Sequence, residues 1–252
     1  MTNQTASEYL KGWSGWSKLY HPHDFEVFTL KTLFPELSQL KVLEVGCGDG
    51  RVSQNLVGEC SKVTAIDIEK DLIEQLAKSN SNLVEYFEMS GTELLFPDNS
   101  FDLILFSWSL HQMKPMITPL KEAFRCLKES GHLVIFGLTE KGQYDDVIEE
   151  FGKNPGHHIT QSDEFIQSVT EVFGKPRIEK RIGNNSEFGF KFDNDEIAVK
   201  NWLWSLENWH SYEISTRDEE KILSIMKNYK KDNGYFLDIY GTLIVVEKKA
   251  NN

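Results

Sequence analysis

The stretch VLEVGCGDGR, residues 42–51, places three glycines within five positions directly after a short apolar run. Gly46, Gly48 and Gly50 each cost conformational entropy on folding. A loop tolerates this cost where its backbone needs unusual φ and ψ angles, or where a ligand approaches the backbone closely. The stretch therefore predicts a strand that ends in a ligand-binding turn.

Strands and helices alternate around this turn. Apolar, β-branched runs separated by stretches of helical periodicity are typical of a parallel sheet with right-handed crossovers. The segment FDLILFS, residues 101–107, is apolar almost throughout, as expected of a strand buried on both faces. Expected strands are 40–45, 62–67, 83–89, 101–107 and 131–139, and expected helices are 24–34, 51–59, 69–79 and 116–130.

The rhythm changes after residue 140. Helical patterns then dominate, with one short strand and a long apolar strand near the end of the sequence. Expected helices are 143–151, 162–173, 194–210 and 217–231, and expected strands are 177–182 and 235–248. One face of the helix over 194–210 predicts ordinary core packing and carries Val199, Trp202, Leu203, Leu206 and Trp209.

Composition and charge exclude several classes of protein. The 252 residues are 40% hydrophobic and 26% charged, which suits one large α/β domain with an elaboration, or two small domains. The net charge of −12 disfavours a nucleic-acid partner, which normally needs a basic surface. The three cysteines form no CxxC pair. No signal-peptide core and no apolar run of about 20 residues occurs, and we therefore expect a cytoplasmic protein without a membrane span.

The glycine spacing separates two kinds of ligand. A dinucleotide fingerprint reads GxGxxG, and here Arg51 stands in place of the third glycine. Glu44 lies just before the glycines, where its charge would repel a phosphate and attract a cationic group. The turn therefore disfavours a pyrophosphate, although an adenosine could still bind, and Glu44 would suit a ligand with a cationic head.

A second acid follows the next expected strand. Asp67 lies about 20 residues beyond the first glycine, where a carboxylate can accept both hydroxyls of a ribose. Ile68 follows it and can cover one face of an adenine. The alternative is an aspartate that caps the helix over 69–79. With the glycine turn upstream, the pattern favours ribose binding.

Four stretches together resemble the class I S-adenosylmethionine-dependent methyltransferases. They are VLEVGCGDGR, VTAIDIEKDLI, LLFPDNSFDLILFSWSLHQM and KEAFRCLKESGHLVIF, in this order and spacing. The resemblance covers roughly residues 40–140 and is closest to the type 11-like, small-molecule branch that includes ubiquinone/menaquinone methyltransferases. The last apolar segment, GYFLDIYGTLIVVEKK, is similar to the closing strand of that family.

The resemblance implies S-adenosylmethionine as the cofactor and assigns residues to it. The glycine turn, with Cys47 inside it, would wrap the methionine and ribose, with Glu44 nearby. Asp67 would hold the ribose and Ile68 the adenine. The turn Ser90–Gly91 would border the adenine amino group. Two further residues would face the methionyl end of the cofactor, Ser107 and Trp108.

Two positions depart from the family pattern. The family commonly has Asp where this sequence has Ser90, and a serine accepts less strongly from the adenine amino group. The family also commonly has Pro-Gly-Gly before its fifth strand, where this sequence reads Glu129-Ser130-Gly131. The second departure concerns a turn and not the chemistry.

Candidate substrate residues lie outside these stretches. His111 follows the fourth expected strand and could act as a general base, or could only bridge neighbouring backbone. Trp16 and Tyr20 belong to a segment that often closes over the cofactor in related enzymes, and they could equally be ordinary packing residues. Trp204 could line a pocket. We expect no metal, because the histidine pairs at 21, 23 and 157, 158 lack a ligand pattern.

These observations predict a Rossmann-like, doubly wound, mostly parallel α/β sheet with an antiparallel closing strand and a helical cap insertion. The predicted function is methyl transfer to an O, N or C nucleophile of a small molecule, without nucleic acid. Alternatives are a protein-directed methyltransferase, a non-catalytic S-adenosylmethionine- or S-adenosylhomocysteine-binding protein, and a nicotinamide oxidoreductase. The predicted parts are a helical lid (1–39), a cofactor-binding core (40–183), a helical cap (184–233) and the closing strand (234–252).

Overall fold

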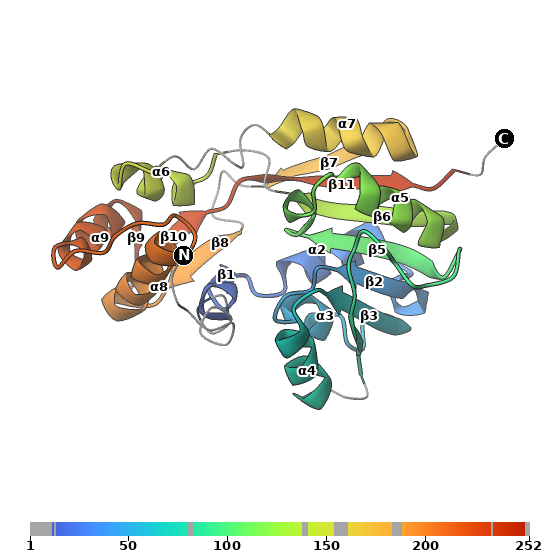
Figure 1. Ribbon diagram of the computed structural model, residues 1–252, viewed down its shortest axis with the longest axis horizontal. Helices are drawn as coiled ribbons and strands as arrows, with labels where there is room; N and C mark the ends of the chain where they lie inside the picture. Colours follow the sequence, from blue (N-terminus) through green and yellow to red (C-terminus); the bar gives the residue numbers. More distant parts are fainter. Residues whose placement is uncertain are drawn as a thin grey trace. The chain divides into compact units, whose positions relative to one another are not determined.

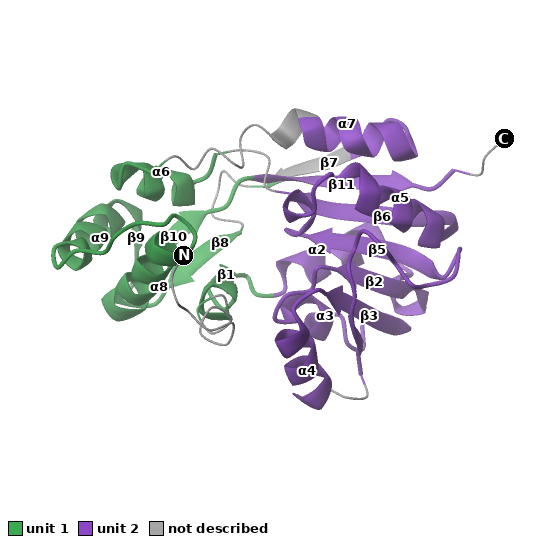
Figure 2. Ribbon diagram, viewed as in Figure 1, with its two compact units in different colours: residues 1–23, 141–156, 182–240 green, residues 24–140, 157–181, 241–252 purple. Residues whose placement is uncertain are grey.

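Two compact units make up the chain (Figure 2). Unit 1 comprises residues 1–23, 141–156 and 182–240, and unit 2 comprises residues 24–140, 157–181 and 241–252. The computed structural model describes Gly12 and residues 14–79, 83–137, 141–153, 161–182, 188–232 and 234–249. No helix in these ranges is both long enough and apolar enough to cross a membrane.

Unit 2 is built on a seven-stranded sheet (Figure 1). Five neighbouring strands, in the order β4, β3, β2, β5 and β6, are parallel to one another, and β11 pairs antiparallel with β6. In spatial order the strands are β4 (Glu85–Glu88), β3 (Lys62–Asp67), β2 (Lys41–Val45), β5 (Phe101–Ser107), β6 (Leu127–Gly137), β11 (Gly241–Glu247) and β7 (Arg177–Ile182).

The strand order reverses between β2 and β5. From β2 the chain runs outward through β3 to β4, and it then returns to the other side of β2 for β5 and β6. With right-handed crossovers, this order puts the helices that follow β2 and β3 on one face and the helix that follows β5 on the other. Such a reversal leaves a crevice at the carboxyl ends of the strands. The helices of unit 2 are α2 (Phe25–Leu33), α3 (Arg51–Asn55), α4 (Lys70–Ser79), α5 (Ile117–Cys126) and α7 (Gln161–Phe173).

The central strands are buried on both faces, as their apolar sequence predicts. Residues 103–106 of β5 and 133–137 of β6 are all buried. Helix α4 shows the expected amphipathic pattern, with Leu72, Ile73 and Leu76 buried. This rigid core holds the turns after β2, β3 and β5 at one edge of the sheet.

Three expected boundaries were wrong. Helix α5 ends at Cys126 and not at residue 130, because Leu127 already pairs with Phe101 of β5. Helix α3 ends at Asn55. The expected strand over 235–248 is two strands, β10 (Gly234–Asp238) and β11, which belong to different sheets because β10 pairs with a short strand that the sequence pattern did not reveal.

That short strand is β8 (Gly189–Phe192), and it lies in unit 1. Its four-stranded antiparallel sheet has the order β1 (Tyr20–His21), β8, β10 and β9 (Lys230–Lys231). The helices of unit 1 are α6 (Gln143–Glu150), α8 (Asp195–Asn208) and α9 (Asp218–Met226).

The predicted packing face of α8 is confirmed. Trp202 and Leu206 are buried, and Val199, Leu203 and Trp209 pack against the same cluster. The expected roles of residues 1–39 as a lid and of 184–233 as a cap stay predictions.

Candidate active site at the carboxyl edge of the unit 2 sheet

The turn after β2 has the backbone that its glycines predict. Gly46, Gly48 and Gly50 have φ angles of +77°, +55° and +79°, in the left-handed region that side chains disfavour. A Cβ on Gly46 would also lie 2.6 Å from the Cβ of Ser109. The amides of Gly46 and Cys47 both donate to the Ile66 carbonyl, at 2.9 and 3.0 Å, which fastens the turn to β3.

Asp67 lies at the end of β3 and serves both readings of the sequence. Its Oδ1 accepts from the Glu69 amide at 3.0 Å, which is the local turn expected before α4. Its Oδ2 accepts from the Gly48 amide at 2.8 Å, which brings the carboxylate against the glycine turn. An ionised carboxylate has about four acceptor positions, so this side chain can still accept from hydroxyls of a ligand. The neighbouring Ile68 is 67% exposed and so presents an uncovered apolar face.

Glu44 is a buried carboxyl near the carboxyl end of strand β2. Burial raises its pKa from 4.5 to about 8, Arg51 opposes this shift, Glu26 adds to it, and hydrogen bonds from Ser53 lower it. Its Oε2 is buried and has no hydrogen-bond partner among the described residues. At neutral pH the group is therefore mostly protonated, and a cation beside it would favour its ionised form.

Cys47 lies inside the glycine turn and is buried. Burial raises the pKa of its thiol well above the ordinary value, and the negative charges of Glu44 and Asp67 raise it further. The thiol is therefore a packing group and not a nucleophile at neutral pH.

Glu26 of α2 was missed by the sequence analysis. It is completely buried, and its carboxylate accepts from Arg51 Nη1 at 2.8 Å and Nη2 at 2.5 Å. It also accepts from the indole Nε1 of Trp108 at 2.8 Å. A signal was available in the sequence: Glu26 lies four residues before Leu30, on the same face of an apolar helix. An acid on a buried face needs a partner, so this position could have been expected to form an ion pair.

The segment after β5 completes this edge of the sheet. Trp108 has a φ of +57°, which is strained for a bulky residue by about 1–3 kcal/mol. Ser109 Oγ donates to the Val45 carbonyl at 2.6 Å, which ties this segment to β2. Ser107 Oγ is buried and has no hydrogen-bond partner among the described residues. His111 lies in a short 3-10 helix, Leu110–Gln112, and is half-buried.

The turn after β4 also reaches this edge. The hydroxyl of Ser90 lies 2.7 Å from that of Thr92 and accepts from the Thr92 amide at 3.2 Å. Gly91 is buried, and a Cβ there would lie 2.7 Å from Val45 Cγ1. The structure therefore brings the predicted cofactor residues of β2, β3, β4 and β5 to one sheet edge.

The predicted lid and substrate residues belong to unit 1. Trp16 is 1% exposed, and its indole donates to the Asn201 carbonyl at 3.0 Å. Tyr20 stacks on Phe188 with ring centroids 5.3 Å apart. Trp204 is half-buried and meets Trp209 edge to face. Their role toward a substrate stays a prediction.

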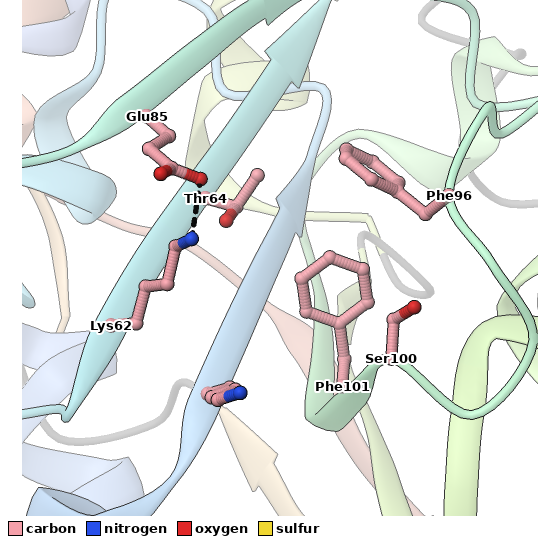
Figure 3. A pocket seen from close by; sticks show the side chains of 7 residues that line it. Lys62, Thr64, Glu85, Phe96, Ser100 and Phe101 are labelled. Carbon is pink, nitrogen blue, oxygen red and sulfur yellow. Dashed lines mark ion pairs between the residues drawn. The ribbon is translucent and has the colours of Figure 1, made fainter.

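A pocket of unit 2 lies at the opposite edge of the sheet (Figure 3). It has a volume of about 180 Å³ and is lined by residues at or near the beginnings of strands. Lys62 and Glu85 pair across it at 2.8 Å. The pocket lacks the buried ionisable groups of the other edge, and so the carboxyl edge stays the candidate site. Its lining residues are Lys41, Lys62, Thr64, Glu85, Phe96, Ser100 and Phe101.

Comparisons with known proteins concern the same part of the chain. Residues 43–135 match the family model of a methyltransferase domain. The ubiquinone/menaquinone biosynthesis C-methyltransferase UbiE of Cronobacter sakazakii is 33% identical over 108 residues, 40% of this chain and 43% of that protein. UbiE of Pseudoalteromonas translucida is 29% identical over 166 residues, 63% of this chain and 59% of that protein. The chain thus spans about half the length of these curated relatives.

The fold is shared with solved structures. The YcgJ protein of Bacillus subtilis superposes with a TM-score of 0.59 over 92% of this chain and 100% of its own, at 16% identity. At that identity the likeness concerns the fold alone. The domain match covers the residues 43–135 that carry the glycine turn, Glu44 and Asp67, so this part of the chain is similar to a methyltransferase domain, as its resemblance to the class I S-adenosylmethionine-dependent methyltransferases predicts.

Proposed function

We propose that the chain transfers a methyl group from S-adenosylmethionine to a small-molecule acceptor, at an oxygen, nitrogen or carbon nucleophile. The observation that carries the proposal is Glu44, a buried carboxyl with an unbonded oxygen beside a left-handed glycine turn. Burying such a group without a partner is costly, and a cationic ligand offsets the cost. S-adenosylmethionine carries two positive groups, its α-ammonium and its sulfonium.

Each residue at the edge has a proposed part in binding. Asp67 accepts the ribose hydroxyls, Ile68 packs against the adenine, and Glu44 pairs with the α-ammonium. The glycine turn lets the ligand approach its backbone closely because no Cβ intervenes. The other proposed cofactor contacts are Gly46, Cys47, Gly48, Gly50, Ser90, Gly91, Ser107 and Trp108.

The chemistry needs little from the protein beyond position. The bound cofactor would supply an electrophilic sulfonium methyl: a lone pair of the acceptor would bond to the methyl carbon while the S–C bond breaks and its electrons stay on the sulfur that leaves. Holding the acceptor in line and excluding water can supply about 7–11 kcal/mol in the best cases. His111 is the candidate to accept the proton that an acidic acceptor loses.

A nicotinamide or phosphate ligand fits this edge less well. Arg51 replaces the glycine that a dinucleotide fingerprint needs, and its guanidinium forms a buried pair with Glu26. That charge is therefore committed within the protein and is not offered to a phosphate. The net charge of −12 supports a small-molecule acceptor rather than nucleic acid, and it is compatible with the expected cytoplasmic location.

Replacing Asp67 with alanine tests the proposal. By isothermal titration calorimetry we expect S-adenosylhomocysteine to bind the wild-type chain and NAD not to bind. Asp67→Ala should weaken binding by about 1–3 kcal/mol, because ribose hydroxyls lose their acceptor. Asp71→Ala, an exposed acid in the first turn of α4, is the matched control and should bind like wild type. Equal affinity for the two variants would contradict the ribose site.

Turnover distinguishes catalysis from binding alone. A panel of phenols, quinols, amines and carboxylates, each with S-adenosylmethionine, should include an acceptor that yields S-adenosylhomocysteine and a methylated product. Binding of the cofactor without product from any class of acceptor would instead favour a non-catalytic binding protein.

A further inference from the structure

A single carboxylate of α2 holds two of the turns that surround the glycine edge. Glu26 accepts two hydrogen bonds from Arg51, the first residue after the glycine turn. It also accepts one from Trp108, the first residue after β5. The three partners are at least nine-tenths buried, so water competes little for these bonds.

Trp108 is held by backbone and ring contacts as well as by this bond. Its backbone is left-handed, and its amide donates to the Phe136 carbonyl at 2.8 Å. Its ring lies against Gly241, where a Cβ would come within 2.9 Å of the indole. The indole N–H of Trp108 therefore connects a strained backbone to Glu26, and through Glu26 to the start of α3.

The same bonds hold the guanidinium of Arg51 on Glu26. Arg51 forms its short ion pair with Glu26, at 2.5 Å, and no ion pair joins it to Glu44 in the described part of the chain. Arg51 still acts on Glu44 through its field, in opposition to the field of Glu26. One cation is therefore shared by two buried carboxyl groups, and Glu26 has the direct contacts.

We propose that Glu26 is a positioning residue of the cofactor site: by pairing with Arg51 it keeps the guanidinium out of a direct ion pair with Glu44, and it thereby reserves Glu44 for a cationic group of the ligand. This proposal rests on the proposed function, since the cation is the α-ammonium of an S-adenosyl amino acid. It adds a determinant of selectivity that lies on α2, outside every stretch that carries the family resemblance.

A pH dependence follows from the groups that face Glu44. They are Arg51, Glu26, Cys47 and Tyr86, and burial raises the pKa of both the Cys47 thiol and the Tyr86 phenol, so neither ionises near neutrality. Glu44, whose pKa is raised to about 8, must lose a proton to pair with a cation. Affinity for a ligand that carries the ammonium should therefore rise from about pH 6 to about pH 8.

Three ligands and one substitution test the proposal. The ligands are S-adenosylhomocysteine, its analogue with hydrogen in place of the α-ammonium, and 5′-methylthioadenosine, which lacks the amino-acid part. In the wild-type chain we expect the ammonium to improve affinity by at least about tenfold. In Glu26→Gln, Arg51 can turn to Glu44. The preference for S-adenosylhomocysteine over the analogue without the ammonium should then fall to about threefold or less. Affinity for 5′-methylthioadenosine should change less than about twofold.

The matched control removes a second ion pair of α2. Glu59 pairs with Lys31 of α2 at 2.8 Å but is exposed, so Glu59→Gln should retain the wild-type preference for the ammonium. Equal loss of affinity for all three ligands in Glu26→Gln would mean that Glu26 is only structural and would overturn the proposal. An unchanged preference in Glu26→Gln would also overturn it.

The wild-type chain provides a second measurement if Glu26→Gln does not fold. Its preference for the ammonium should increase between about pH 6 and about pH 8. A preference that does not change with pH would contradict the claim that Glu44 has no ion-pair partner among the described residues of the free chain. Failure of the proposed function looks different, because the wild-type chain would then bind neither S-adenosylhomocysteine nor 5′-methylthioadenosine.

Discussion

The two edges of the unit 2 sheet differ in shape and in electrostatics. The amino edge has a pocket of about 180 Å³, and its Lys62–Glu85 pair is exposed. The carboxyl edge has left-handed glycines, the buried Glu26–Arg51 pair and a carboxyl whose Oε2 lacks a hydrogen bond. If the proposed function is right, hollow shape is therefore the weaker guide to the site. Strained backbone and buried polar groups without hydrogen-bond partners, whose free-energy cost a ligand can offset, are the stronger guide.

Alanine substitution of two glycines should give the largest contrast between the edges. Gly46 and Gly58 have nearly equal φ angles, +77° and +80°, but a Cβ on Gly46 meets Ser109 at 2.6 Å while a Cβ on Gly58 meets nothing within 4 Å. Gly46→Ala should cost about 2–5 kcal/mol of unfolding free energy, from left-handed strain and overpacking together. Gly58→Ala, on the connection that leads to the amino edge, should cost about 1–2 kcal/mol. Urea denaturation measures both, and equal costs would contradict the close approach at Gly46.

Replacement of an acid by its amide sharpens the comparison of charge. The pKa of Glu44 is raised from 4.5 to about 8, so the folded chain holds this proton more tightly than the unfolded chain. The stability contributed by the protonated group is fully present below about pH 4.5 and is lost as pH rises to about 8. Glu44→Gln should therefore stabilise the free protein by about 2–4 kcal/mol at pH 8 and by less than about 1 kcal/mol at pH 5.

An exposed acid at the amino edge serves as the control for Glu44. Glu85→Gln breaks the surface pair with Lys62 and should change stability by less than about 1 kcal/mol at either pH. Thermal unfolding at the two pH values measures both variants. A Glu44→Gln variant that loses stability as pH rises, relative to wild type, would show that the buried carboxyl is satisfied in the free protein.

No effect on ligand affinity is expected for a substitution inside the amino-edge pocket. Thr64 is buried and lines the pocket, and valine has nearly the same shape. Thr64→Val should leave the affinity for S-adenosylhomocysteine unchanged and should alter stability by no more than about 1–2 kcal/mol, the range for a single hydroxyl. A large loss of affinity would place a ligand at the amino edge and reverse the assignment of the two edges.

Local patterns predicted much of the carboxyl edge. The left-handed glycines, the placement of Asp67 beside them and the buried strand over 101–107 all follow from residues that are close in sequence. The contacts of Glu26 could not be predicted in this way, because its partners lie 25 and 82 residues away. Strand β8 was missed for a related reason, since four residues become a strand only through pairing with β1 and β10.

Counting protons released on binding tests the central claim most directly. Calorimetric titrations of S-adenosylhomocysteine at pH 7, in buffers of different ionisation enthalpy, give the number of protons that leave the protein. If the ligand's ammonium pairs with Glu44, whose pKa is about 8 in the free chain, the release should approach one proton, and 5′-methylthioadenosine should release none. Binding of S-adenosylhomocysteine with no proton released would contradict the account.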